Sequence, residues 1–159
     1  MFPQSSPRFA RAPERKQLPD GTEVLLRSIQ PGDCELLARG FQQFSDESRY
    51  RRFFRATPRY DASLRRHITD VATSLVWLAL DGDRCVGEAR VVTSTRQPCG
   101  DLAVTVADDF HGRGLGSRLA RRAVAEHLRS NDCVSFSILP GNTSATRIPV
   151  FTEPISFPG

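Results

Sequence analysis

The chain has 159 residues, of which 39% are hydrophobic and 25% are charged, a composition typical of one globular domain with a single core. No apolar run approaches the ~18 residues of a membrane span, and the first residues lack the apolar stretch of a secretory signal, so we expect a cytoplasmic protein. The net charge of +4 favours anionic ligands such as phosphates, but the arginines form no single block, which argues against nucleic acid as a partner.

The N-terminal part of the chain divides into an arm and the start of a folded domain. Residues 1–20 are rich in proline and have little hydrophobic periodicity, which predicts a disordered or loosely attached arm. We expect one domain over residues 21–159. Its first strand is predicted at 23–29, and apolar residues at helical spacing predict a helix over 33–41.

The hydrophobic period changes several times along the rest of the chain, which indicates alternating helices and strands. Ser45 and Asp61 can each cap a helix, the second ending at about residue 70. A turn is predicted at 97–100, where proline and glycine occur together. The remaining predicted elements are strands at 75–80, 85–93, 101–107 and 134–139, and a long amphipathic helix at 114–130. This order predicts an α/β (α+β) fold with a mixed, mostly antiparallel central sheet flanked by helices.

The four cysteines lie far apart in the sequence, and no two of them form a C-x-x-C pair. Structural zinc sites and dithiol redox motifs usually show such close spacing. We therefore expect no metal site, and reduced thiols that serve in packing at Cys34, Cys85, Cys99 and Cys133.

The clearest functional signal is a loop with three alternating glycines, Gly112, Gly114 and Gly116, between a predicted strand and the long helix. The first N–H groups of a helix lack internal acceptors, and glycine lets a ligand approach the backbone, so such a loop can cradle a phosphate. A P-loop would need a lysine beside its serine or threonine, and this loop has none. A dinucleotide fingerprint would need the spacing G-x-G-x-x-G, whereas this loop has G-x-G-x-G. A glycine-rich turn that binds nothing is the remaining alternative.

The sequence from His111 to Gly116 resembles the coenzyme-A loop of the GNAT acyltransferase superfamily, with His111 in the place of Gln or Arg. The segments 24–29, 31–33, 45–54, 86–92 and 101–106 are similar to bacterial Pat-type protein lysine acetyltransferase domains. The resemblance implies a GNAT-like fold, acetyl-CoA as co-substrate and an amine acceptor, with a protein lysine as the leading class. It implies coenzyme contacts at Val104, Val106, His111, Gly112, Arg113, Gly114, Leu115, Gly116, Ser117 and Asn142.

Acetyl transfer from a thioester to an amine needs a base for the amine proton and a donor for the oxyanion. The resemblance places the base at Asp101, where the family usually has glutamate, and a shorter aspartate would act through a water molecule. The alternative for Asp101 is a solvated turn residue. Glu88 is the second catalytic candidate, with an ordinary place on a strand face as its alternative. A backbone N–H within 101–107 would be the oxyanion donor.

The resemblance ends after Arg147, before the helix and strands that complete the family pattern. The family often carries a tyrosine acid in that helix, whereas Tyr50 and Tyr60 both lie far upstream. Two functions therefore stay open: an N-acetyltransferase, or a catalytically weak coenzyme-A-binding sensor or interaction domain. The tail at 149–159 is expected to fold along the last strand or to pair with a second copy in a homodimer.

Overall fold

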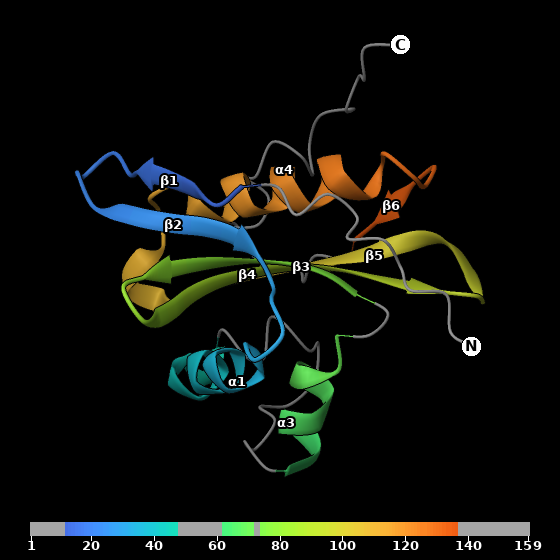
Figure 1. Ribbon diagram of the computed structural model, residues 1–159, viewed down its shortest axis with the longest axis horizontal. Coiled ribbons are helices and arrows are strands. Elements are labelled where there is room, and N and C mark those ends of the chain that lie inside the picture. Colours follow the sequence, from blue (N-terminus) through green and yellow to red (C-terminus); the bar gives the residue numbers. More distant parts are fainter. Residues whose placement is uncertain (1–11, 48–61, 72–73, 137–159) are drawn as a thin grey trace.

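The computed structural model describes residues 12–47, 62–71 and 74–136. They form one twisted sheet with a single helix on one face and two helices on the other (Figure 1). The strands are β1 (Glu14–Gln17), β2 (Glu23–Ser28), β3 (Ser74–Asp81), β4 (Arg84–Ser94), β5 (Gln97–Val106) and β6 (Val134–Ser135). The helices are α1 (Cys34–Gln43), α3 (Ala62–Thr69), α4 (Leu115–His127) and the short 3-10 helix η1 (Asp108–Phe110).

The strand order is β1-β2-β3-β4-β5-β6, and each pair from β1 to β5 is antiparallel. Strand β6 runs parallel to β5, with Gly100 opposite Val134 and Asp101 opposite Ser135. A parallel neighbour requires a crossover connection, which α4 provides. The predicted fold class, a mostly antiparallel mixed sheet flanked by helices, is confirmed.

Helix α4 packs closely on the sheet because a glycine lies beneath it. A Cβ atom at Gly87 in β4 would lie only 2.7 Å from Leu119 Cδ1. Trp77 in β3 is fully buried, and its indole N–H donates to Glu126 Oε2 at 2.6 Å. The apolar stripe predicted for this helix, which includes Leu115 and Val124, is buried against the sheet. These contacts fix where the first turn of α4 lies.

The N-terminal arm is shorter than the sequence predicts. Residues 14–17 of the predicted loose arm form β1, paired with β2. Glu14 forms ion pairs with Lys16 and with Arg122 of α4, and Arg15 contacts Glu23 at 2.8 Å. An edge strand held by ion pairs lacks the apolar alternation that predicts a strand. Residues 1–11 lie outside the described residues.

The turn predicted at 97–100 is also wrong. Strands β4 and β5 are joined by a two-residue turn at 95–96, with Ser94 opposite Gln97, so β5 begins earlier than predicted. Proline and glycine in 97–100 suggested a turn, but they lie inside the strand. The other helices and strands lie close to their predicted positions, except that residues 137–139 of the last strand and most of the helix after Ser45 lie outside the described residues.

Two of the cysteines that were expected to be reduced form a disulfide. Cys99 and Cys133 are 34 residues apart in the sequence, but the parallel pairing of β5 and β6 brings their Cα atoms to 4.7 Å. Sequence spacing could not reveal this, because the contact depends on strand pairing. Cys34 and Cys85 are free thiols, and burial raises the pKa of Cys85 to about 12.

Candidate functional site

The glycine loop is open on the side where a ligand could approach. Gly112 has φ +73° and Gly114 has φ +77°, the left-handed region that favours glycine. A Cβ atom at either position would meet no described atom within 4 Å. Gly114 precedes the first residue of α4, and no side chain in the described part of the chain caps this end of the helix. The first-turn N–H groups of α4, from Leu115 to Ser117, are therefore available for an anionic ligand.

Ion pairs connect the segment around the glycine loop to the β3–β4 turn and to the β1–β2 turn. Arg84 in the β3–β4 hairpin binds Asp109 through two hydrogen bonds of 2.8 and 2.9 Å, which lower the pKa of Asp109. The guanidinium groups of Arg84 and Arg113 lie 6.0 and 5.0 Å from the centroid of the buried Phe110 ring. These contacts hold the residues that precede α4 against the sheet.

Arg113 was expected to contact the phosphates, but in the structure it pairs with an acid that the sequence did not single out. Its Nη1 atom lies 2.8 Å from Asp20 Oδ2 in the turn between β1 and β2. The N–H of Thr22 lowers the pKa of Asp20, and the charge of Arg113 lowers it further. Arg113 is one-third exposed, so its contact with a coenzyme stays a prediction.

His111 joins the end of β5 to the glycine loop. Its Nε2 atom donates to the carbonyl oxygen of Val106 at 2.8 Å. Its expected contact with the coenzyme stays a prediction. Leu115 is buried, so only its backbone is placed to meet a ligand. Asn142 and the tail at 149–159, for which we predict a coenzyme contact and a dimer interface, lie outside the described residues.

The backbone of β5 offers hydrogen-bond groups on the side away from β4. The N–H of Gly100 donates to the Cys133 carbonyl at 3.1 Å, whereas the N–H of Ala107 donates to the Val86 carbonyl in β4 at 2.9 Å. Because these directions alternate along a strand, the N–H of Val104 points toward the β6 side. The described part of β6 ends at Ser135, so no described strand residue faces this group. It is the candidate oxyanion donor.

The two acidic candidates lie on the sheet face opposite α4. Gly87 and Gly100 both face α4, so their neighbours Glu88 and Asp101 project toward the side of α1 and α3. Asp101 is exposed at the point where β5 meets β6. The structure therefore leaves the Asp101 carboxyl accessible to water and to an acceptor.

Glu88, by contrast, is buried and forms an ion pair. It is 1% exposed, and its Oε1 accepts a hydrogen bond of 2.5 Å from Arg90. Arg90 also donates to the carbonyl of Ile68 in α3 at 2.6 Å. The Oε2 atom of Glu88 and the hydroxyl of Thr105, its cross-strand neighbour, are buried and have no hydrogen-bond partner among the described residues. This arrangement suits a structural role better than proton exchange with solvent.

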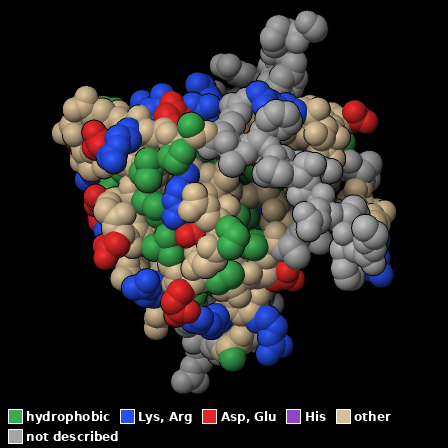
Figure 2. Space-filling view, in the orientation of Figure 1, with side chains coloured by type: hydrophobic (Ala, Val, Ile, Leu, Met, Phe, Trp, Pro, Cys, Tyr) green, Lys and Arg blue, Asp and Glu red, His purple; other side chains and the backbone are tan. Residues whose placement is uncertain are grey.

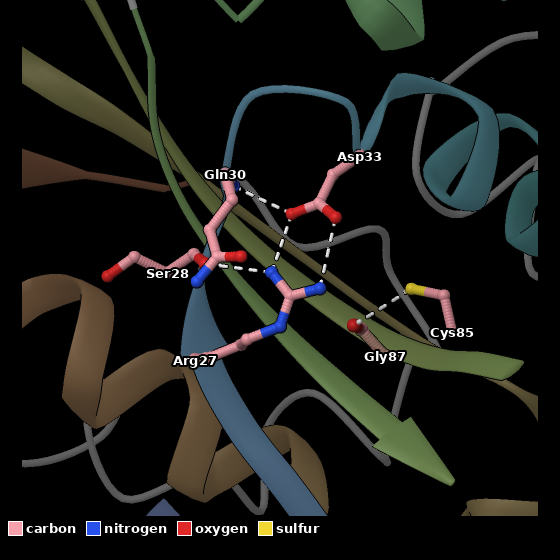
Figure 3. A network of polar contacts seen from close by, with 6 residues as sticks. All are labelled: Arg27, Ser28, Gln30, Asp33, Cys85 and Gly87. Carbon is pink, nitrogen blue, oxygen red and sulfur yellow. Dashed lines mark hydrogen bonds and ion pairs between the residues drawn. The ribbon is translucent and has the colours of Figure 1, made fainter. Parts of the chain in front are cut away.

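A second polar network, which the sequence did not reveal, fixes the loop between β2 and α1 (Figure 3). Arg27 of β2 donates to both carboxylate oxygens of Asp33 at 2.6 and 3.0 Å. The N–H of Gln30 donates to Asp33 at 2.6 Å. Arg27 lowers the pKa of Asp33, and both side chains are largely buried. The network places the start of α1 beside the face that carries the acidic candidates.

Charge is dispersed over the surface that Figure 2 shows. Acidic and basic side chains lie at intervals around hydrophobic ones, without a patch of one sign. In the described ranges, no helix is long and apolar enough to cross a membrane. Nor do these ranges contain a group of three or more His, Cys, Asp or Glu side chains placed to hold a metal ion.

The sequence is similar to a known protein family and to named members of it. The model of the Acetyltransferase (GNAT) family matches residues 38–149. Acetyltransferase Pat of Mycolicibacterium smegmatis is 33% identical over 108 residues, which are 65% of this chain and 32% of Pat. Acetyltransferase PA5475 of Pseudomonas aeruginosa is 30% identical over 115 residues, 69% of this chain and 62% of PA5475. The matches thus span about a third and about three-fifths of these two relatives.

Solved structures give the same result. The GNAT domain of S. lividans PAT superposes with a TM-score of 0.72 at 25% identity, covering 86% of this chain and 84% of that domain. A cAMP-binding acyltransferase from Mycobacterium smegmatis gives a TM-score of 0.56 at 26% identity, covering 86% of this chain and 41% of that protein. The resemblance of the glycine loop and the upstream segments to the GNAT superfamily is confirmed. The chain belongs to the acetyltransferase (GNAT) family.

Proposed function

We propose that this domain transfers an acetyl group from acetyl-CoA directly to an amine, with a protein lysine as the acceptor. One observation carries the proposal: β5 presents an exposed acid on one face and leads into an open glycine loop at the start of α4. Coenzyme and acceptor can thus meet along a single strand. The family match and the similarity to named acetyltransferases support the same activity.

The glycine loop would hold the pyrophosphate of acetyl-CoA. The N–H groups of Gly116 and Ser117 belong to the uncapped first turn of α4, where the helix dipole adds partial positive charge. Arg113 lies beside them and could add a full charge by sharing its contact with Asp20. The N–H of Val104 would donate to the thioester oxygen as it becomes an oxyanion.

Asp101 would act as the base for the acceptor amine. A lysine is protonated at neutral pH and must lose a proton before its nitrogen can attack the thioester carbonyl. The Asp101 carboxylate would accept this proton through a water molecule, because aspartate is one methylene shorter than glutamate. As the C–S bond breaks, the coenzyme leaves as a thiolate and takes up a proton. The exposed carboxylate would also attract a cationic lysine side chain.

Coenzyme binding can be tested at Gly116, which lies inside α4. Gly114 is a poor choice, because its left-handed conformation would strain any other residue. We expect Gly116→Phe to weaken acetyl-CoA binding more than tenfold, about 1.4 kcal/mol, in calorimetric titration. Arg121→Phe places the same ring on the exposed side of the helix and should leave affinity unchanged. Equal affinity in both folded variants would remove the loop from the coenzyme site.

The base can be tested by measuring thiol release from acetyl-CoA with a lysine-containing protein as acceptor. Asp101→Asn should lower kcat about 10²-fold at neutral pH while acetyl-CoA affinity stays the same. The loss should shrink as pH rises, because more of the amine is already neutral. Asp83→Asn, in the exposed β3–β4 turn, is the control. Tight acetyl-CoA binding without thiol release would instead favour the sensor function.

A further inference from the structure

The disulfide lies at the junction of the two strands that frame the proposed site. Cys99 belongs to β5, and Cys133 immediately precedes β6. The residues that follow them form the described pairs between these strands, Gly100 with Val134 and Asp101 with Ser135. The cross-link therefore lies two residues before the proposed base.

The disulfide also lies close to the proposed base along β5. A Cβ atom at Gly100 would lie 2.5 Å from Val91 Cγ1 and 2.7 Å from the His127 ring, so Gly100 faces α4. Side chains alternate along the regular part of a strand, which directs the adjacent Asp101 to the opposite face, and the pairing of β5 with β4 is irregular only between Gln97 and Asp101. Residues two apart along an extended strand are separated by about 7 Å. Breaking the disulfide would thus alter the position of the backbone at Asp101.

Few other contacts hold this junction together in the described residues. The N–H of Gly100 donates to the Cys133 carbonyl at 3.1 Å, and His127 Nε2 donates to the same oxygen at 3.2 Å. Ser135 Oγ contacts the Gly100 carbonyl at 3.5 Å. On its other edge, β5 pairs with β4 at Gln97 and from Asp101 to Val106, with an irregularity in between. Loss of the cross-link would therefore loosen the β6 side and leave the β4 side intact.

We propose that Cys99 and Cys133 form a redox switch for the acetyl transfer proposed above, on which this inference rests. The disulfide keeps β5 and β6 in register and holds Asp101 in place, so the oxidised form is the active one. Reduction frees β6 and lowers turnover. The glycine loop lies at the far end of β5, beyond Val106, so coenzyme affinity is the same in both forms.

The switch needs only thiol–disulfide exchange. A dithiol reductant attacks one sulfur, forms a mixed disulfide and then closes on itself, giving two protein thiols and a cyclic disulfide. In the reverse direction, a small disulfide accepts two electrons and leaves as two thiols. Both cysteines are only half-buried, so small thiols can reach them. Where a disulfide occurs in a reducing compartment, it usually has a catalytic or redox-sensing role.

The test compares the full chain oxidised with glutathione disulfide and reduced with dithiothreitol, with the thiol state verified by mass spectrometry. We expect turnover to fall about tenfold on reduction, while calorimetry finds unchanged acetyl-CoA affinity. Cys99→Ser and Cys133→Ser should keep the low turnover in both conditions. Cys34→Ser, which removes an exposed free thiol, should keep the full redox response.

Amide hydrogen exchange separates this inference from the proposed function. Reduction should speed exchange at Gly100, whose N–H is bonded to the Cys133 carbonyl, even if no acceptor is acetylated. Faster exchange without turnover in either form would overturn the acetyl transfer, and with it the role of the switch in catalysis. Equal exchange and equal turnover in both forms would overturn the switch, as would global unfolding on reduction, which circular dichroism would detect.

Discussion

The contact between Gly87 and Leu119 sets how closely α4 approaches the sheet, and a double-mutant cycle can measure it. A Cβ atom added at Gly87 would lie 2.7 Å from Leu119 Cδ1, and 3.5 Å from both Ala79 Cβ and the Thr105 carbonyl oxygen. Leu119 is fully buried, so its side chain has little room to move away. Gly87→Ala should therefore push α4 outward or distort the leucine rotamer.

The structure sets the size of each effect. Overpacking in Gly87→Ala should cost about 1–3 kcal/mol of unfolding free energy. Leu119→Ala should cost about 3–5 kcal/mol, through lost burial and a residual cavity. In the double variant the new methyl group occupies space that Leu119 has vacated, so Gly87→Ala then costs nothing or stabilises slightly. The expected coupling between the two sites is about 1–3 kcal/mol in favour of the double variant.

Urea unfolding of the four proteins measures this coupling. Val124→Ala, on the same helix, is the control, because no atom of Val124 is among the three nearest to a Cβ at Gly87. Its effect on the unfolding free energy should therefore add to that of Gly87→Ala. Acetyl-CoA titration provides a second measurement, since moving α4 also moves the loop. Additivity of Gly87→Ala and Leu119→Ala within ~0.5 kcal/mol would refute the steric argument.

Two further predictions concern buried ion pairs. Arg27 lowers the pKa of Asp33, so this pair stabilises the fold above the unfolded pKa of about 3.9 and the contribution fades as pH falls below it. Asp33→Asn should cost about 2–4 kcal/mol at pH 7, and urea titrations at decreasing pH should show the gap to wild type closing below about pH 4. Glu88→Gln should cost about 3 kcal/mol, because the buried charge of Arg90 loses its acidic partner. The pH profile of turnover should nevertheless keep its shape. A shifted profile would move the base from Asp101 to Glu88.

The sequence predicts the parts of this protein that depend on local pattern. The apolar run of β3, the stripe of α4 and the glycine loop all follow from residue types at fixed spacing. Each is a property of one short run of consecutive residues, in which burial and backbone freedom can be read directly. The glycine loop was informative because its conformation and its proposed chemistry need the same residue type.

What the sequence missed depends on contacts between distant segments. Strand β1 is held by ion pairs such as Glu14 with Arg122, which lie 108 residues apart. The Cys99–Cys133 bond needs the parallel pairing of β5 and β6. The partner of Arg113 is Asp20, an acid in a turn that has no motif. In each case the residues are visible in the sequence, but only the sheet order brings them together.

Side chains and N–H groups alternate in direction along β5, so one strand can contact both the coenzyme and the acceptor in the proposed reaction. Gly100 and the residues at even positions face α4, and their N–H groups point toward the β6 side, as the bond from Gly100 to Cys133 shows. Asp101 and the residues at odd positions face α1 and α3 and bond to β4, as Ala107 does. A coenzyme lying along the even positions and an acceptor approaching from the odd face would meet where β6 stops pairing with β5. The function proposed here therefore depends on the register of β5, which is why the disulfide at its start can control turnover without touching the coenzyme.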